Sequence, residues 1–119
     1  FRRVLFRSAD PLARRALRVS MGNAFHVPHS RVSDVAGFVK SLNAEGVATI
    51  ALTPSGDAVP LRDVQINQSR RLLLFGSERE GLDTNVMSAC SHRVRIEMQE
   101  GVDSLNVAAA SAIACYALR

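Results

Sequence analysis

Hydrophobic residues along the chain follow two kinds of pattern. Residues 47–52 and 71–75 are mostly apolar and show no alternation with polar residues, which is typical of strands covered on both faces of a parallel sheet. Between Asp34 and Gly46, apolar residues recur at positions i, i+3, i+4 and i+7, so the pattern predicts a helix that begins at Asp34 and ends at Gly46. The part of the chain with the clearest hydrophobic pattern is therefore predicted to be a helix followed by buried strands.

Weaker signals extend this alternation towards both ends. They predict a helix opened by Asp10-Pro11 and ended by Gly22-Asn23, a strand over 24–27, a short helix capped by Asp83 and running through Cys90, a strand over 94–98, and an alanine-rich helix over 105–119. Strands that alternate with helices predict an α/β fold, with a parallel sheet and helices on both faces. Four strands make a thin sheet, which we interpret as a sign that an N-terminal portion is missing.

The composition is that of one globular domain. The chain has 119 residues, of which 47% are hydrophobic and 22% charged, enough for a core but not for two domains. No apolar run approaches the ~20 residues of a membrane span, and no signal peptide is recognisable. Cys90 and Cys115 lie in apolar helical patterns without metal or redox spacing, so we expect reduced, buried thiols and a cytoplasmic protein.

The positive net charge depends on the first eight residues. Residues 1–8 look unlike the rest of the chain and resemble translated adaptor sequence, so we expect a non-native leader over 1–8 and the domain over 9–119. The alternative is a genuine basic first strand. Without the three arginines of this segment, the formal net charge falls from +4 to +1, and the charge alone then indicates little about nucleic acid.

Ligands of open parallel sheets collect at the carboxyl ends of the strands, which here are the loops after Leu52, Phe75 and Met98. In the loop after Phe75, Gly76 and Gly81 bracket three charged residues, and glycine lets the backbone approach a ligand closely. The alternative interpretation is an ordinary strand-to-helix turn.

Ser104 and Asn106 are polar residues at the start of an otherwise apolar helix rich in small residues. If Ser104 or Asp103 is only the N-cap, Asn106 is left unexplained, which favours a functional role for it.

Other polar residues are poorer candidates. The three histidines form no metal spacing, so we expect no metal. Arg14, Arg15 and Arg18 are either the solvated face of a helix or contacts to RNA.

Two segments of the chain resemble motifs of the SpoU/TrmH branch of the SPOUT methyltransferases. Residues 72–82, an apolar strand followed by Gly-x-Glu-x-x-Gly, resemble the second motif of that family. Residues 96–98, followed by Ser-Leu-Asn-Val at 104–107 and an alanine-rich helix, resemble the third. The motifs occur in the order and spacing of the family, and the similarity runs over about residues 9–119.

The resemblance implies an S-adenosylmethionine-dependent enzyme that methylates the ribose 2′-hydroxyl of a structured tRNA or rRNA and works as a homodimer. It also implies a deep trefoil knot within residues 72–119, a topology that general rules would not predict. By their positions in the motifs, the expected cofactor-binding residues are Gly76, Ile96, Met98 and Leu105. The resemblance also implies Leu52 and Thr53, which lie at the strand end that contributes to the adenine pocket. The expected catalytic residues are Glu78, Ser104 and Asn106, and the expected RNA contacts are Arg14, Arg18 and Arg79.

The sequence departs from the family pattern in one respect. The first motif, an Asn followed by an Arg that is thought to help activate the 2′-hydroxyl, would lie upstream of Ala9 and is not present. The alternative function is therefore a catalytically incomplete module that binds cofactor or dimerises. A nucleotide-binding doubly wound domain is a weaker alternative, because no Gly-x-Gly-x-x-Gly and no phosphate-loop lysine follows any predicted strand.

Overall fold

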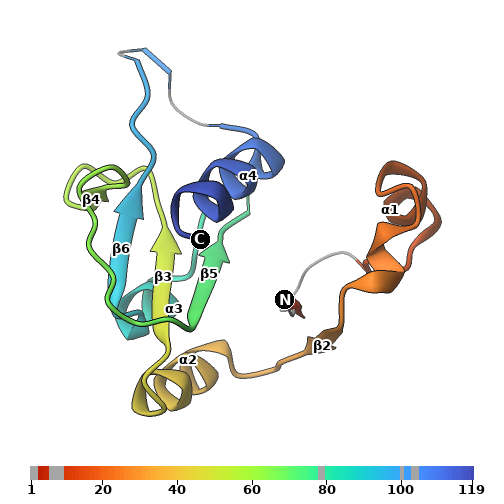
Figure 1. Cartoon of the computed structure of the whole chain (residues 1–119), viewed down its shortest axis with the longest axis horizontal. Coiled ribbons are helices and arrows are strands. Elements are labelled where there is room, and N and C mark those ends of the chain that lie inside the picture. The colour runs from red at the N-terminus through yellow and green to blue at the C-terminus, as the bar shows by residue number, and fades with distance from the viewer. Residues whose placement is uncertain (1–2, 6–9, 78–79, 100, 103–104) are drawn as a thin grey trace. The chain divides into compact units, whose positions relative to one another are not determined.

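The computed structural model of the chain (Figure 1) describes residues 3–5, 10–77, 80–99, 101–102 and 105–119. The chain consists of two compact units, residues 1–35 and 36–119, and each is described by itself.

The larger unit is built around a parallel sheet. Its strands are β3 (Ala48–Leu52), β4 (Val59–Pro60), β5 (Arg71–Phe75) and β6 (His92–Arg95). Within the described residues the strand order is β4-β6-β3-β5, and neighbouring strands are parallel throughout. β3 is the central long strand, and its first four residues are buried. All these strands therefore end at one edge of the sheet, where ligand sites of such folds form.

Helices flank this sheet, which confirms the predicted α/β class. Figure 1 shows α4 (Val107–Ala117) in front of the sheet, where it contacts β5, and α3 (Thr84–Ala89) behind the strands. The remaining helix of this part of the chain is α2 (Val35–Ala44), whose Val39 side chain is fully buried. No helix of the described residues is long and apolar enough to cross a membrane.

A buried polar network ties β3 to its neighbours. The Thr49 hydroxyl donates to Oδ1 of Asn43 on α2 at 2.6 Å, and it accepts from the Ser91 backbone N–H at 2.9 Å. The Asn43 amide in turn donates to the carbonyl of Ala89 at the end of α3. Because Thr49 is fully buried, its hydroxyl requires these partners, and they fix α2 and the turn between α3 and β6 on the central strand.

Several predicted boundaries of the larger unit are confirmed. Strand 71–75 is β5 as predicted, and the strand predicted over 47–52 is β3, which begins one residue later. The helix predicted to open at Asp34 begins at Val35, and Gly46 adopts a φ of +74° just after it. Asp83 caps α3, because its carboxylate accepts from the Asn85 N–H at 2.8 Å.

Two predicted boundaries in the larger unit are wrong. The strand predicted over 94–98 is β6, which covers 92–95. Its pairing with β3 ends at Val94 and its pairing with β4 ends at Arg95, so residues 96–98 lie beyond both ladders. The helix predicted from Leu105 begins at Val107, because Asn106 is its N-cap and accepts from the Ala108 N–H at 2.8 Å. β4 has only two residues, too few for a hydrophobic pattern to predict it.

The smaller unit contains a parallel pair of short strands, β1 (Arg3–Leu5) and β2 (His29–Arg31), with α1 (Arg14–Val19) and the 3₁₀ helix η1 (Asn23–His26) between them. β1 lies within the eight residues expected as a leader and corresponds to the alternative, a basic first strand.

Two predictions fail in the smaller unit. The first helix begins at Arg14 and not at Asp10-Pro11, because the Asp10 carboxylate and carbonyl accept from the next backbone N–H groups and form a turn. Residues 24–27 are not a strand: Gly22 turns the chain with a φ of +80°, and its carbonyl accepts from the Phe25 N–H. An apolar run of four residues is too short for its pattern to distinguish the two conformations.

Candidate functional site

A cavity of about 560 Å³ opens at the carboxyl ends of the strands in the larger unit. This volume lies within the range of small-molecule sites. Its walls come from the segments that follow β3, β5 and β6, from α3 and from the start of α4. The lining residues are Leu52, Thr53, Pro54, Phe75, Gly76, Ser77, Glu80, Gly81, Met87, Ile96, Met98, Leu105, Val107 and Ala110.

The cavity brings together the residues expected to bind the cofactor. Its lining includes all of the expected cofactor-binding residues, which are Leu52, Thr53, Gly76, Ile96, Met98 and Leu105. Sequence reasoning missed the other members of the wall, although Ser77, Glu80 and Gly81 lie inside the second motif. The remaining lining residues, such as Met87 and Ala110, belong to apolar helical patterns that are typical of a core and do not indicate a ligand site.

The other expected site residues have different outcomes. Glu78, Arg79 and Ser104 lie outside the described residues. Asn106 is exposed and directly follows the lining residue Leu105. Arg14 and Arg18 are exposed on α1, in the smaller unit.

The loop after β5 is a tight glycine turn. Ser77 and Gly81 exchange two backbone hydrogen bonds of 3.1 and 3.0 Å, and the Ser77 hydroxyl accepts from the Glu80 N–H. Gly81 adopts a φ of +68°, which favours glycine. A Cβ on Gly76 would lie 2.2 Å from the Gly81 carbonyl carbon, so only glycine fits there. The two glycines thus allow the chain to form this turn. Because they have no side chains, their backbone atoms form part of the cavity wall.

The cavity wall is mostly apolar. Thr53, Ser77 and Glu80 supply polar side chains, and Glu80 is the ionisable residue among the described lining residues. Such a wall suits a ligand with an apolar ring that is held mainly by backbone groups. Within the described part of the chain, no three His, Cys, Asp or Glu residues are grouped closely enough to hold a metal ion.

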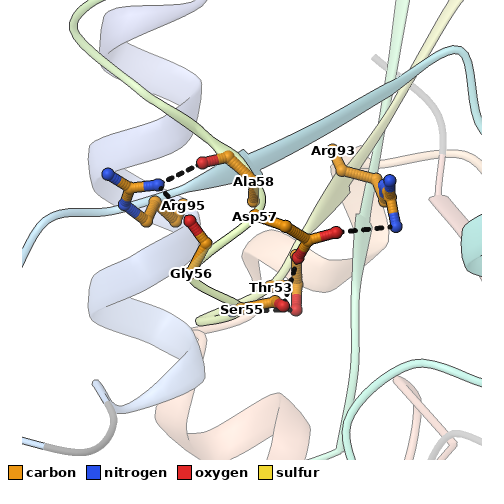
Figure 2. Close-up of polar contacts among 7 residues, drawn as sticks. All are labelled: Thr53, Ser55, Gly56, Asp57, Ala58, Arg93 and Arg95. Atoms are coloured by element: carbon orange, nitrogen blue, oxygen red, sulfur yellow. Dashed lines mark hydrogen bonds and ion pairs between the residues drawn. The ribbon is translucent and has the colours of Figure 1, made fainter.

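Side chains of β6 hold the loop that follows β3, as Figure 2 shows. The Arg95 guanidinium donates from Nη1 to the carbonyls of Gly56, at 3.0 Å, and Ala58. Arg93 forms an ion pair with Asp57 at 3.2 Å. The Ser55 hydroxyl donates to the other oxygen of Asp57 and, together with Arg93, lowers the pKa of that carboxyl. No sequence pattern predicts this arrangement.

A smaller cavity of about 390 Å³ lies beside the turn between α3 and β6 and is lined by Met87, Ser88, Cys90, Ser91 and Arg93. The Cys90 thiol donates to the Val86 carbonyl at 3.3 Å. Burial raises the pKa of this thiol above its ordinary value of 9.0, and a hydrogen bond with Thr49 opposes that shift. Cys90 and Cys115 are both free and half-buried.

We expect Cys90 to react slowly with iodoacetamide at pH 8, because burial keeps it in the unreactive thiol form. A raised pKa means that the folded state binds the proton more tightly than the unfolded state. The stability that results is present below the unfolded pKa and is lost as pH rises through the higher folded pKa. The prediction on reactivity is tested by measuring the alkylation rate of Cys90 in a Cys115→Ser variant, once in the native state and once in urea. Equal rates in the two conditions would contradict the burial argument.

The chain is similar to known RNA methyltransferases. The model of the SpoU rRNA methylase family matches residues 1–116. Over 110 residues the chain is 44% identical to an uncharacterized tRNA/rRNA methyltransferase of Mycobacterium tuberculosis, which covers 91% of this chain and 38% of that protein. Over 112 residues it is 30% identical to RlmP of Bacillus subtilis, a 23S rRNA (guanosine(2553)-2′-O)-methyltransferase, which covers 94% of this chain and 44% of that protein.

The chain is also similar to solved structures of RNA methyltransferases. The chain is similar to the AdoMet-bound rRNA methyltransferase from Sinorhizobium meliloti, with a TM-score of 0.85 and 28% identity over 98% of this chain and 43% of the other. The chain thus spans less than half the length of each of these relatives.

Proposed function

Because the chain belongs to the SpoU rRNA methylase family, we propose that it binds S-adenosylmethionine (AdoMet) and takes part in methylation of a ribose 2′-hydroxyl in tRNA or rRNA. The observation that carries this proposal is the convergence of both motifs on one cavity. The similarity to RlmP, a 2′-O-methyltransferase, and to an AdoMet-bound rRNA methyltransferase supports it.

The residues of the cavity fit this cofactor. Its volume suits a nucleoside with a short amino-acid chain, and its apolar wall suits an adenine ring. Backbone groups of Gly76, Ile96 and Leu105 would hold the adenosine and methionine parts, and Leu52 and Thr53 would form part of the adenine pocket. When bound, AdoMet supplies a sulfonium-activated methyl group that is open to in-line displacement.

The protein side of the reaction is alignment of the attacking 2′-oxygen and help with the loss of its proton. We assign Asn106, Glu78 and Ser104 to this task. The Oδ1 atom of Asn106 is engaged in capping α4, so its amide NH₂ is the group left to orient a substrate hydroxyl. Arg14, Arg18 and Arg79 are assigned to phosphate contacts with RNA.

The proposal extends to topology and assembly. We propose a trefoil knot within 72–119. Arg71 donates to the Leu118 carbonyl, which supports a close approach of the two ends of that segment. We also propose a homodimer, as the resemblance to the family implies. The two free thiols support a reducing, cytoplasmic location.

A substitution that fills the cavity tests the cofactor site. Ala110 lines the cavity from α4, whereas its neighbour Ala109 is exposed and is not part of the wall. We expect calorimetry to show saturable binding of AdoMet to the unaltered chain and a loss of at least about tenfold in affinity for Ala110→Leu. Ala109→Leu, the matched control, should bind as the unaltered chain does. No binding by the folded unaltered chain would overturn the proposal.

A further inference from the structure

We infer that Arg95 is a positioning residue for the cofactor cavity, because it fixes the loop of residues 53–58 that forms one wall. The inference rests on the proposed function, since AdoMet is the ligand that this wall would contact. It is carried by the contacts of the loop with β6, which Figure 2 shows in part.

Backbone hydrogen bonds hold this loop to β6 at both of its ends. The Thr53 N–H donates to the Val94 carbonyl at 3.0 Å, where β3 ends. At the far end, β4 pairs with residues 94 and 95, and the Leu61 N–H donates to the Arg95 carbonyl at 2.8 Å. The segment between these anchors turns back on itself and is tied to β6 by side chains.

Arg95 supplies the central tie. One guanidinium nitrogen donates to the carbonyls of Gly56 and Ala58, two residues apart in the turn. Ala58 is only 2% exposed, so loss of the donor would leave its carbonyl with little access to water. Arg95 itself is half-buried, and the planar guanidinium can satisfy both carbonyls from a single position.

The neighbouring ion pair is a weaker tie. Arg93 and Asp57 are both more than half exposed, and exposed pairs contribute little to stability. Arg93 reaches a carboxylate on a side chain, whereas Arg95 reaches the backbone of the loop directly. We therefore expect the loop to depend on Arg95 much more than on Arg93.

The position of Arg95 connects two walls of the cavity. Thr53 and Pro54, at the start of the loop, line one side, and Ile96, the next residue after Arg95, lines another. A guanidinium that binds Gly56 and Ala58 therefore holds the turn that directly follows Thr53 and Pro54, and its loss would let this wall shift relative to Ile96. Small errors in the position of a wall weaken ligand binding even where no contacting side chain has changed.

Arg95→Ala tests the inference, with S-adenosylhomocysteine as the probe. We expect its Kd to rise about tenfold, which corresponds to ~1.4 kcal/mol. Amide hydrogen exchange of residues 53–61 should become faster, while exchange of β5 stays unchanged. Arg95→Lys, which keeps a charged donor, should recover part of the affinity and serves if the alanine variant does not fold. Arg93→Ala should change the Kd less than threefold.

Arg70→Ala is the matched control. Arg70 also donates from its guanidinium to a backbone carbonyl, that of Glu45, but at the amino end of the strands. Its loss should leave the Kd unchanged. If Arg95→Ala is folded and binds as the unaltered chain does, or if Arg70→Ala weakens binding equally, the inference is wrong. If the unaltered chain binds no probe, the proposed function fails and the inference falls with it.

Discussion

Gly76→Ala is expected to weaken cofactor binding strongly and to destabilise the larger unit. A Cβ at this position would lie 2.2 Å from the carbonyl carbon of Gly81, 2.4 Å from the nitrogen of Leu82 and 2.6 Å from the Gly81 Cα. All three are backbone atoms, so no side-chain rotation relieves the clash. The two hydrogen bonds between Ser77 and Gly81 would have to break for the chain to move away.

The size of this effect follows from its place in the fold. Forcing an extra methyl group into a packed site costs about 1–3 kcal/mol, and occasionally more. Because the displaced segment is itself part of the cavity wall, we expect the affinity for AdoMet to fall by at least ~100-fold, which requires only ~2.7 kcal/mol. Calorimetry measures the affinity, and thermal unfolding followed by circular dichroism measures the stability.

Gly56→Ala is the matched control for this substitution. A Cβ on Gly56 would meet no atom within 4 Å, although Gly56 lies in the loop after β3 that Arg95 holds. This variant should fold and bind nearly as the unaltered chain does. Wild-type affinity in Gly76→Ala would show that the turn after β5 adapts, and that glycine is not required there.

The parts of the fold that the sequence predicted well are those whose hydrophobic pattern matches their burial. β5 consists of Arg71 and four consecutive apolar residues, and both of its ends agree with the prediction. β3 is buried along nearly its whole length and was predicted to within one residue. Since parallel strands end at the same edge, the positions of these strands also located the candidate site, and the resemblance to family motifs then named six residues of its wall.

The parts that could not be predicted depend on contacts between distant residues. β6 ends at Arg95 because its pairing with β3 ends at Val94 and its pairing with β4 ends at Arg95, facts about partner strands that the pattern of residues 94–98 does not contain. The donation from Arg95 to Gly56 joins positions 39 residues apart. In the sequence, Arg95 is one of several arginines and carries no periodic signal. Strand pairing and long-range hydrogen bonds depend on the tertiary structure, whereas the pattern of residues along the sequence indicates mainly local conformational preference.

Asn106 combines local and functional roles, and two substitutions separate them. Asn106→Ala removes the hydrogen bond from the Ala108 N–H that caps α4, so we expect a loss of about 1 kcal/mol in unfolding free energy. Asn106→Ser keeps a hydroxyl that caps as well as asparagine does, and its stability should stay near that of the unaltered chain. Both variants lack the amide NH₂ proposed to orient the substrate hydroxyl.

The catalytic hypothesis for Asn106 therefore rests on Asn106→Ser. We expect methyl transfer to RNA, measured by tritium transfer at saturating AdoMet, to fall about 100-fold, because a misplacement of the reacting oxygen by about 1 Å can cost ~10²-fold in rate. The affinity for S-adenosylhomocysteine should stay within about twofold, since backbone groups nearby make the proposed cofactor contacts. Ser111→Ala, which removes a side-chain hydrogen bond on the exposed part of the same helix, is the control and should leave turnover unchanged. Full turnover in Asn106→Ser, with the helix cap intact, would assign Asn106 to capping alone and remove it from the reaction.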